Sequence, residues 1–294
     1  MLTTKRATCL LISVIVLLFH SCGNRSDSPV IGPEKGSLVI AGGGRIPTVI
    51  HEKFASLAGG FEANIVVIPT AGSPDRIDTL LAKEKWEDIG FSNVTVLHTT
   101  DPEEANKKEF YSKIDSASGV WFEGGRQWRL VDAYYKTQTH ISLYELLKRG
   151  GVIGGSSAGA SIQGSFLARG DVSGNTIMIS DNEKHRKGLG FLKNTAIDQH
   201  IDTRNRWGDI QEIVLKYPRL LGIGISESTA IIVSGDTFEV KGAGNVAITT
   251  HESITGEDNG IGYKILYPGD NYNMRDREKI KLCDIETVAA KKNN

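Results

Sequence analysis

The sequence predicts an α/β fold in which a mostly parallel β-sheet is flanked by helices. Short runs rich in Val and Ile alternate with segments of helical spacing across residues 36–155, and such runs are typical of strands buried on both faces. Several runs end in glycine-rich turns, which places those turns at one edge of a parallel sheet. With 39% hydrophobic and 23% charged residues, the composition excludes a disordered chain and a multi-pass membrane protein.

The strands and helices are expected in regular alternation. Strands are expected at 36–41, 64–68, 93–97, 119–122 and 151–155. Helices are expected at 48–57, 76–88, 102–112 and 129–148. Later runs at 223–225, 230–233 and 237–240 have the length and turn spacing of strands joined by tight turns. The glycine turns at 42–44, 124–125 and 154–155 should therefore lie together at the carboxyl edge of the sheet.

The N-terminus has the pattern of an export signal. Lys5 and Arg6 precede an unbroken apolar run at 10–19, which is too short to span a bilayer and matches a signal-peptide core. The small residue and Cys22 that follow resemble a bacterial lipoprotein signal, which implies cleavage before Cys22 and its lipidation. A plain signal peptide and an uncleaved anchor are the alternatives.

This pattern divides the chain into three parts. Residues 1–21 are expected to be a lipoprotein-type signal peptide, and 22–35 a polar tether. Residues 36–294 are expected to form a single α/β domain. The protein would then be exported to the bacterial cell envelope, either periplasmic or at the surface, and held at the membrane through its N-terminal lipid only.

Charge and cysteine content exclude several kinds of partner. The 34 Lys and Arg nearly balance the 35 Asp and Glu, so the formal net charge of −1 gives no pull toward nucleic acid. The three cysteines are too few for a disulfide framework and too far apart for a zinc cluster.

The segment 154–161, Gly-Gly-Ser-Ser-Ala-Gly-Ala-Ser, is the most informative motif. Small residues around Ser157 allow a sharp strand-to-helix turn that exposes its hydroxyl as a nucleophile. The backbone amide of Ala158 is then placed to donate to an oxyanion. A phosphate-binding turn or a simple helix start is the alternative interpretation.

A nucleophilic serine needs a base and a carboxylate that orients the base. His200 lies in a polar string after the semi-apolar run 194–197, whereas His185 lies in a charged loop and is expected to be solvated. Glu227 follows a run that predicts a buried strand, and the end of a strand is a suitable place for the orienting carboxylate. Asp198 and Asp202 remain alternatives for that role.

These residues resemble the cyanophycinase and peptidase E family of serine peptidases. The resemblance rests on four segments in family order: 122–127, 154–161, 198–206 and 222–230. It implies a flavodoxin-like, class I glutamine-amidotransferase-like architecture with a nucleophile elbow. The chain order Ser, His, Glu differs from that of the α/β-hydrolases and argues against a lipase or esterase of that fold.

The resemblance also implies roles for individual residues. Ser157 would be the nucleophile, His200 the general base and Glu227 its orienter, with the amides of Gly125 and Ala158 forming the oxyanion hole. The implied substrate-binding residues are Gln127, Asp198, Gln199, Arg204 and Arg206. The implied substrate is a peptide with an aspartyl or β-aspartyl bond, cleaved without a metal or an organic cofactor, and the implied assembly is a homodimer.

Three residues depart from the family pattern. Arg126 stands where Asp is usual, Asp209 where cyanophycinases carry a third Arg, and Ser226 where Asp is common. The catalytic candidates are all present, but the substrate is left open. A cell-wall peptide amidase or carboxypeptidase and a lipid-tethered binding protein on an inactive scaffold are the alternative functions.

Overall fold

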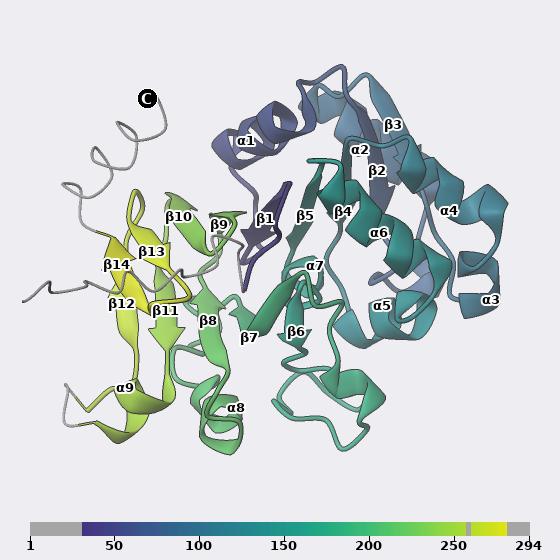
Figure 1. Ribbon diagram of the computed structural model, residues 1–294. Coiled ribbons are helices and arrows are strands. Elements are labelled where there is room, and N and C mark those ends of the chain that lie inside the picture. Colours follow the sequence, from purple (N-terminus) through teal and green to yellow (C-terminus); the bar gives the residue numbers. More distant parts are fainter. Residues whose placement is uncertain (1–30, 257–259, 281–294) are drawn as a thin grey trace, which may run out of the picture.

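Two β-sheets and the helices around them form the part of the chain described by the computed structural model, residues 31–256 and 260–280 (Figure 1). The larger sheet has the strand order β14-β13-β10-β9-β1-β5-β4-β2-β3. Its parallel part consists of β1 (Ser37–Ala41), β2 (Asn64–Ile68), β3 (Asn93–Val96), β4 (Gly119–Phe122) and β5 (Val152–Ser156). The antiparallel extension consists of β9 (Thr229–Ser234), β10 (Thr237–Gly242), β13 (Asn271–Asn273) and β14 (Glu278–Ile280).

The smaller sheet has the order β12-β11-β8-β7-β6. Its strands are β6 (Gly164–Phe166), β7 (Leu192–Gln199), β8 (Leu221–Ile225), β11 (Val246–Thr249) and β12 (Lys264–Leu266). The first three run parallel, and Gln199 at the end of β7 pairs with Ile225 at the end of β8. The segments that follow these two strands therefore begin side by side.

Helices cover both faces of the larger sheet. On one face, α1 (Thr48–Ala58) and α2 (Thr79–Ile89) bury Phe54 and Trp86 against Trp121 of β4. On the other, α3 (Pro102–Ala105), α4 (Lys108–Asp115), α5 (Gln127–Tyr134) and α6 (Gln138–Lys148) pack in one apolar cluster that also includes the smaller sheet. The remaining helices are α7 (Ala158–Ser161), α8 (Gln211–Lys216) and α9 (His251–Thr255), with 3-10 turns at Pro74–Arg76 and Lys184–Arg186. The predicted class of fold, strands flanked by helices, is confirmed.

The sequence predicts two long helices that are wrong, because the structure has two shorter helices in place of each. The predicted helix at 129–148 breaks between α5 and α6, where Lys136 adopts a left-handed backbone (φ 65°). Thr137 then caps α6 by accepting the backbone N–H of His140. The predicted helix at 102–112 is likewise divided into α3 and α4. Helical periodicity continues across both breaks, so it did not reveal them.

The N-terminal predictions fall largely outside the described residues. The signal peptide 1–21, the first part of the tether and the cysteines Cys9, Cys22 and Cys283 lie there. The end of the predicted tether packs on the domain, because Ile31 is buried and donates its N–H to Asp236 Oδ1 at 2.7 Å. Among the described residues, no helix has the length and apolar character needed to cross a bilayer.

Candidate active site

Ser157 occupies a sharp turn between β5 and α7. Its backbone has φ 54° and ψ −112°, a conformation that costs an L-residue about 1–3 kcal/mol and persists only where surrounding contacts hold it. The N–H of Ser157 donates to the carbonyl of Ala41 at 3.0 Å. A Cβ on Gly155 would lie 2.3 Å from the carbonyl oxygen of Gly159, and one on Gly159 would lie 2.1 Å from that of Phe122. The small residues of the motif therefore allow the close packing that the turn requires.

A line of hydrogen bonds joins Ser157, His200 and Glu227. Ser157 Oγ lies 2.9 Å from His200 Nε2, and His200 Nδ1 lies 2.5 Å from Glu227 Oε1. Because the carboxylate can only accept, Nδ1 carries the proton and Nε2 is left to accept the hydroxyl proton of Ser157. Thr203 Oγ1 also donates to Glu227 Oε1 at 3.0 Å. The imidazole thus faces a serine on one side and an anchored carboxylate on the other.

Neither of the two alternative carboxylates contacts the imidazole through a hydrogen bond. Asp202 Oδ1 instead accepts the backbone N–H of Glu227 at 2.9 Å, which fixes the segment that carries Glu227. Asp198 forms an ion pair with Arg169. Of the three carboxylates considered from sequence, Glu227 is the one that the fold brings to His200.

The glycine turn after β1 packs closely against the side chains of His200 and Glu227. A Cβ on Gly43 (φ 107°) would lie 2.3 Å from Cε1 of His200, and one on Gly44 (φ 66°) would lie 2.4 Å from Oε2 of Glu227. The carbonyl of Gly42 accepts the N–H of His200 at 3.0 Å. The sequence predicts this turn at the correct edge of the sheet but gives no sign that it packs against these two side chains.

The electrostatic setting favours a neutral imidazole and an ionised carboxylate. Burial lowers the pKa of His200 below its ordinary value, the hydrogen bond and charge of Glu227 oppose this, and the charges of Arg204 and Arg206 lower it further. The hydrogen bond from His200 lowers the pKa of Glu227, with a further contribution from Thr203. At neutral pH the imidazole can therefore accept a proton while the carboxylate carries the charge that would stabilise the resulting imidazolium.

The segments that carry Ala158 and Gly125 both adjoin the serine. Ala158 is the first residue of α7, and the first N–H groups of a helix have no acceptor within it. A Cβ on Gly124 would lie 3.3 Å from Cβ of Ser157, so the turn that carries Gly125 is adjacent to the nucleophile candidate. Gly125 itself has φ 148° and lies against the carbonyl of Ala71, which also accepts the N–H of Arg126 at 2.7 Å.

Two of the residues expected to bind substrate are engaged in the fold. Gln127 is buried and donates through Nε2 to the carbonyl of Ala168 at 2.8 Å. Asp198 is buried and accepts from Nε and Nη2 of Arg169 at 2.8 and 2.9 Å. The contact of Arg169 with Asp198 is not evident from the sequence, because the two residues are 29 positions apart and meet through the parallel pairing of β6 with β7.

The other expected substrate residues retain unpaired groups. Arg204 is exposed. Gln199 Oε1 and Arg206 Nη1 are buried and have no hydrogen-bond partner within the described part of the chain. Two of the departing residues are also buried or paired: Ser226 is buried, and Asp209 is bonded to Arg169 at 2.6 Å.

The expectation that His185 is solvated is wrong. The 3-10 turn at 184–186 directs its ring inward, where it is 4% exposed and lies 6.1 Å from the ring of Trp128. Its Nε2 lies 3.0 Å from Asp132 Oδ1. Charged neighbours in the sequence indicated a solvated loop, but the ring is held by Asp132 and belongs to the structure of that loop rather than to the Ser157 site.

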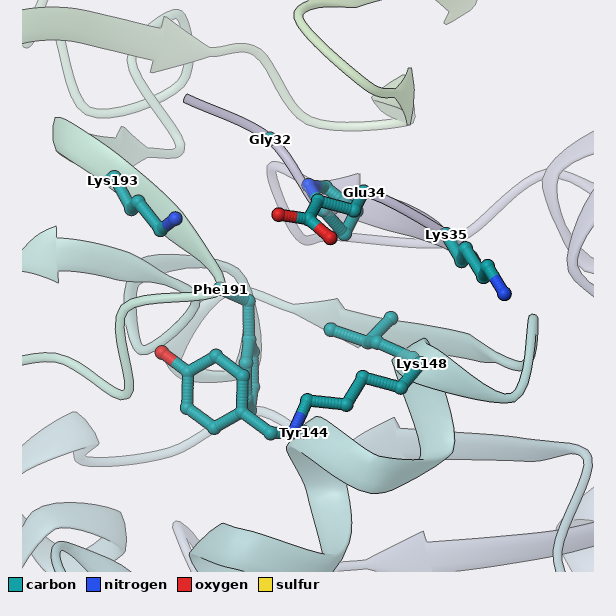
Figure 2. A pocket seen from close by; sticks show the side chains of 9 residues that line it. Gly32, Glu34, Lys35, Tyr144, Lys148, Phe191 and Lys193 are labelled. Carbon is teal, nitrogen blue, oxygen red and sulfur yellow. The ribbon is translucent and has the colours of Figure 1, made fainter. Parts of the chain in front are cut away.

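A separate cavity of about 370 Å³ lies at the opposite, amino edge of the parallel strands (Figure 2). It is formed by the segment before β1, the end of α6 and the start of β7. Its lining residues are Gly32, Pro33, Glu34, Lys35, Tyr144, Leu147, Lys148, Phe191 and Lys193. None of the candidate catalytic residues lines it. No group of three His, Cys, Asp or Glu side chains suited to a metal occurs among residues 31–256 and 260–280.

The class of protein follows from this fold and from comparison with known proteins. An α/β fold that places a serine hydroxyl, an imidazole and a carboxylate in one hydrogen-bonded line has the arrangement of a serine hydrolase. The family model for peptidase family S51 matches residues 38–241. The chain belongs to peptidase family S51 and is a cyanophycinase-like serine hydrolase.

Its similarity to individual proteins supports this assignment. A cyanophycinase of Synechococcus elongatus is 30% identical over 271 residues, which cover 84% of this chain and 82% of the relative. One of Trichormus variabilis is 31% identical over 209 residues, or 70% of each chain. The crystal structure of a peptidase from an acI-B1 actinobacterium superimposes with a TM-score of 0.64 at 24% identity, covering 81% of this chain and 97% of that one. A putative peptidase E of Listeria monocytogenes (TM-score 0.52, 18% identity, 71% and 99% covered) shares the fold.

Proposed function

We propose that this protein is an exported serine peptidase that hydrolyses aspartyl or β-aspartyl peptide bonds with Ser157, His200 and Glu227 as its catalytic triad. The observation that carries the proposal is the continuous hydrogen-bonded line from Ser157 Oγ through the imidazole to Glu227. The type of bond is suggested by membership of family S51 and by the similarity to proteins named cyanophycinase.

The reaction proceeds in two halves. Ser157 Oγ attacks the scissile carbonyl carbon while His200 Nε2 takes the hydroxyl proton, and the carbonyl oxygen becomes an oxyanion. The amides of Gly125 and Ala158 donate to that oxyanion. The C–N bond then breaks, the amine leaves with the proton from His200, and an acyl-enzyme remains.

Water completes the cycle. His200 takes a proton from the attacking water, and the resulting tetrahedral intermediate collapses with return of that proton to Ser157 Oγ. The product leaves with a new carboxyl group. Throughout both halves, Glu227 holds the imidazole in one tautomer and stabilises its protonated form.

The arginines of the turn after β7 supply recognition of the substrate carboxylate. An aspartyl or β-aspartyl residue carries a free carboxylate near the scissile bond, and the planar fork of arginine matches a carboxylate with two parallel hydrogen bonds. Arg204 and Arg206 both act electrostatically on His200, so their charges lie within reach of the reacting groups. Arg126 directly follows Gly125 and adds a third cation that can bind the substrate carboxylate.

Activity on defined substrates tests the proposal. The full chain and its Ser157→Ala variant are assayed for release of amino acids from α-aspartyl and β-aspartyl dipeptides, from cyanophycin and from cell-wall peptides. Cleavage of aspartyl substrates by the wild type alone is expected. Cleavage of cell-wall peptides alone would make the protein a cell-wall amidase or carboxypeptidase. Binding without cleavage of any substrate would make it a binding protein.

Export and lipidation form a separate part of the proposal. They rest on the apolar run at 10–19 and on Ser21 and Cys22, which follow shortly after that run. The full chain produced in a bacterium with labelled fatty acid is expected to carry the label in the membrane fraction, and Cys22→Ser is expected to lack it. Equal labelling of both proteins, or of neither, would overturn the lipid anchor. Size-exclusion chromatography with light scattering tests the proposed homodimer.

A further inference from the structure

Arg169 is a buried cation beside the candidate active site, and it forms ion pairs with two carboxylates. Its side chain is 2% exposed. Nε and Nη2 donate to the two oxygens of Asp198 at 2.8 and 2.9 Å, and Nη2 also donates to Asp209 Oδ2 at 2.6 Å. Nη1 donates to the carbonyl of Asn175 at 2.7 Å. Both acidic side chains are therefore fixed by one guanidinium.

The ion pairs of Arg169 adjoin the catalytic candidates. Asp198 precedes His200 by two residues at the end of β7. Arg206 follows in the same turn, where its N–H donates to the carbonyl of Ile201 at 2.7 Å. The charge of Arg206 in turn acts on His200. Arg169, Asp198 and Arg206 thus belong to one cluster next to the imidazole.

Arg206 lies within electrostatic reach of both acidic groups but pairs with neither. After burial, the positive charge of Arg169 is the main influence that lowers the pKa of Arg206, while Asp198 and Asp209 act in the opposite direction. The side chain of Arg206 is buried, and its Nη1 has no hydrogen-bond partner within the described residues. A buried arginine is normally paired with an anion. Its natural partners here are held by Arg169.

We infer that Arg169 is a positioning residue that keeps Arg206 free to bind the carboxylate of the substrate, and so sets the preference of the site for an anionic residue. This inference deepens the proposed function and rests on it for the identity of the substrate. With Arg169 in place, the cluster of Arg169, Arg204 and Arg206 with Asp198 and Asp209 has one positive charge in excess. Without Arg169 the excess is lost, and the released carboxylates compete with the substrate for Arg206.

Calorimetric titration of the full chain tests this directly. L-Aspartate serves as the probe, and asparaginamide, in which both carboxylates are replaced by amides while the α-amino group is kept, is the control that has no carboxylate. The wild type is expected to bind aspartate at least about tenfold more tightly than asparaginamide, because a charge-assisted pair is stronger than a neutral one. Arg169→Gln is expected to weaken the binding of aspartate by about tenfold or more, because the released carboxylates compete for Arg206, and not to weaken the binding of asparaginamide.

A second set of variants avoids an uncompensated buried charge. Arg169→Gln combined with Asp198→Asn removes both members of the buried pair, and such a replacement is tolerated better than the loss of one partner. This double variant still has Asp209 free to pair with Arg206, so weak aspartate binding is expected. Adding Asp209→Asn removes that competitor and is expected to restore the affinity to within about threefold of the wild type. A purely structural role of Arg169 predicts no such recovery.

The outcomes separate this inference from the proposed function. Equal binding of aspartate by wild type and Arg169→Gln, equal weakening of both ligands, or failure of Asp209→Asn to restore binding would overturn the role of Arg169. Wild-type binding that does not distinguish aspartate from asparaginamide would overturn it too. Aspartate binding that depends on Arg169, in a protein that cleaves no aspartyl bond, would uphold this inference while the proposed function fails.

Discussion

His200 Nδ1 lies 2.5 Å from Glu227 Oε1, although 27 residues separate the two in the chain. The contact arises because β7 and β8 run side by side in the smaller sheet and each ends at the same level. His200 directly follows β7, and Glu227 lies two residues beyond β8. His200 and Glu227 are therefore brought together by strand pairing, and the turn at Gly43 and Gly44 after β1 packs against both side chains.

Glu227→Gln should lower kcat by about a thousandfold to ten-thousandfold, with KM changed much less. An amide at this position can donate to Nδ1, which permits the wrong tautomer and leaves no charge opposite the imidazolium. Steady-state kinetics on the substrate identified above give the measurement. Glu252→Gln, on the exposed helix α9, is the matched control and should retain full activity. Equal activity of Glu227→Gln and the wild type would remove Glu227 from the mechanism.

Ser157 and its neighbour Ser156 provide an internal control for the nucleophile. Ser157→Ala should abolish hydrolysis and leave the thermal unfolding midpoint within a few degrees, because within the described part of the chain the hydroxyl forms its one side-chain hydrogen bond with His200. Ser156 ends β5 and makes no hydrogen bond to the imidazole. Ser156→Ala should therefore retain most of the activity. Loss of activity in Ser156→Ala with retention in Ser157→Ala would assign the nucleophile to the other serine.

The pH dependence of kcat/KM should have an acidic limb below pH 6.5. His200 acts in its neutral form, and burial lowers its pKa from 6.5, so activity is retained until the pH falls through the lowered pKa. The charge of Arg204 contributes to that lowering. Its removal in Arg204→Gln should raise the pKa of His200 and move the acidic limb to higher pH. Lys113→Gln, an equal charge change on α4, should leave the limb in place.

Several elements of the fold could be predicted from local sequence. The strands at 64–68 and 119–122 were predicted with the bounds of β2 and β4, because apolar runs between turn residues mark buried strands clearly. The break between α5 and α6 was not predicted, since it depends on Lys136 adopting a left-handed backbone within an otherwise helical pattern. Turn conformations of this kind follow from tertiary contacts more than from local preference.

The candidate site shows the same limit. Ser157, His200 and Glu227 were identifiable because each has a recognisable residue type at the end of a strand-like run. Arg169 was not, because its sequence neighbours Ala168 and Gly170 give no indication of a role. Its contact with Asp198 appears only when β6 and β7 pair. The same holds for Gly43, whose contact with His200 joins two segments that are distant in the chain.

Gly43→Ala offers a test of that contact. An added Cβ would lie 2.3 Å from Cε1 of His200, so the imidazole must shift away from residue 43. This shift changes its alignment with Ser157, and kcat should fall by about a hundredfold, as expected for a displacement near 1 Å. Gly59→Ala is the matched control, because Gly59 also has a positive φ (104°) but an added Cβ there meets nothing within 4 Å. Both variants should lose about 1 kcal/mol of stability from backbone strain. Only Gly43→Ala should lose activity, and an equal loss in both would show that strain rather than contact with His200 is responsible.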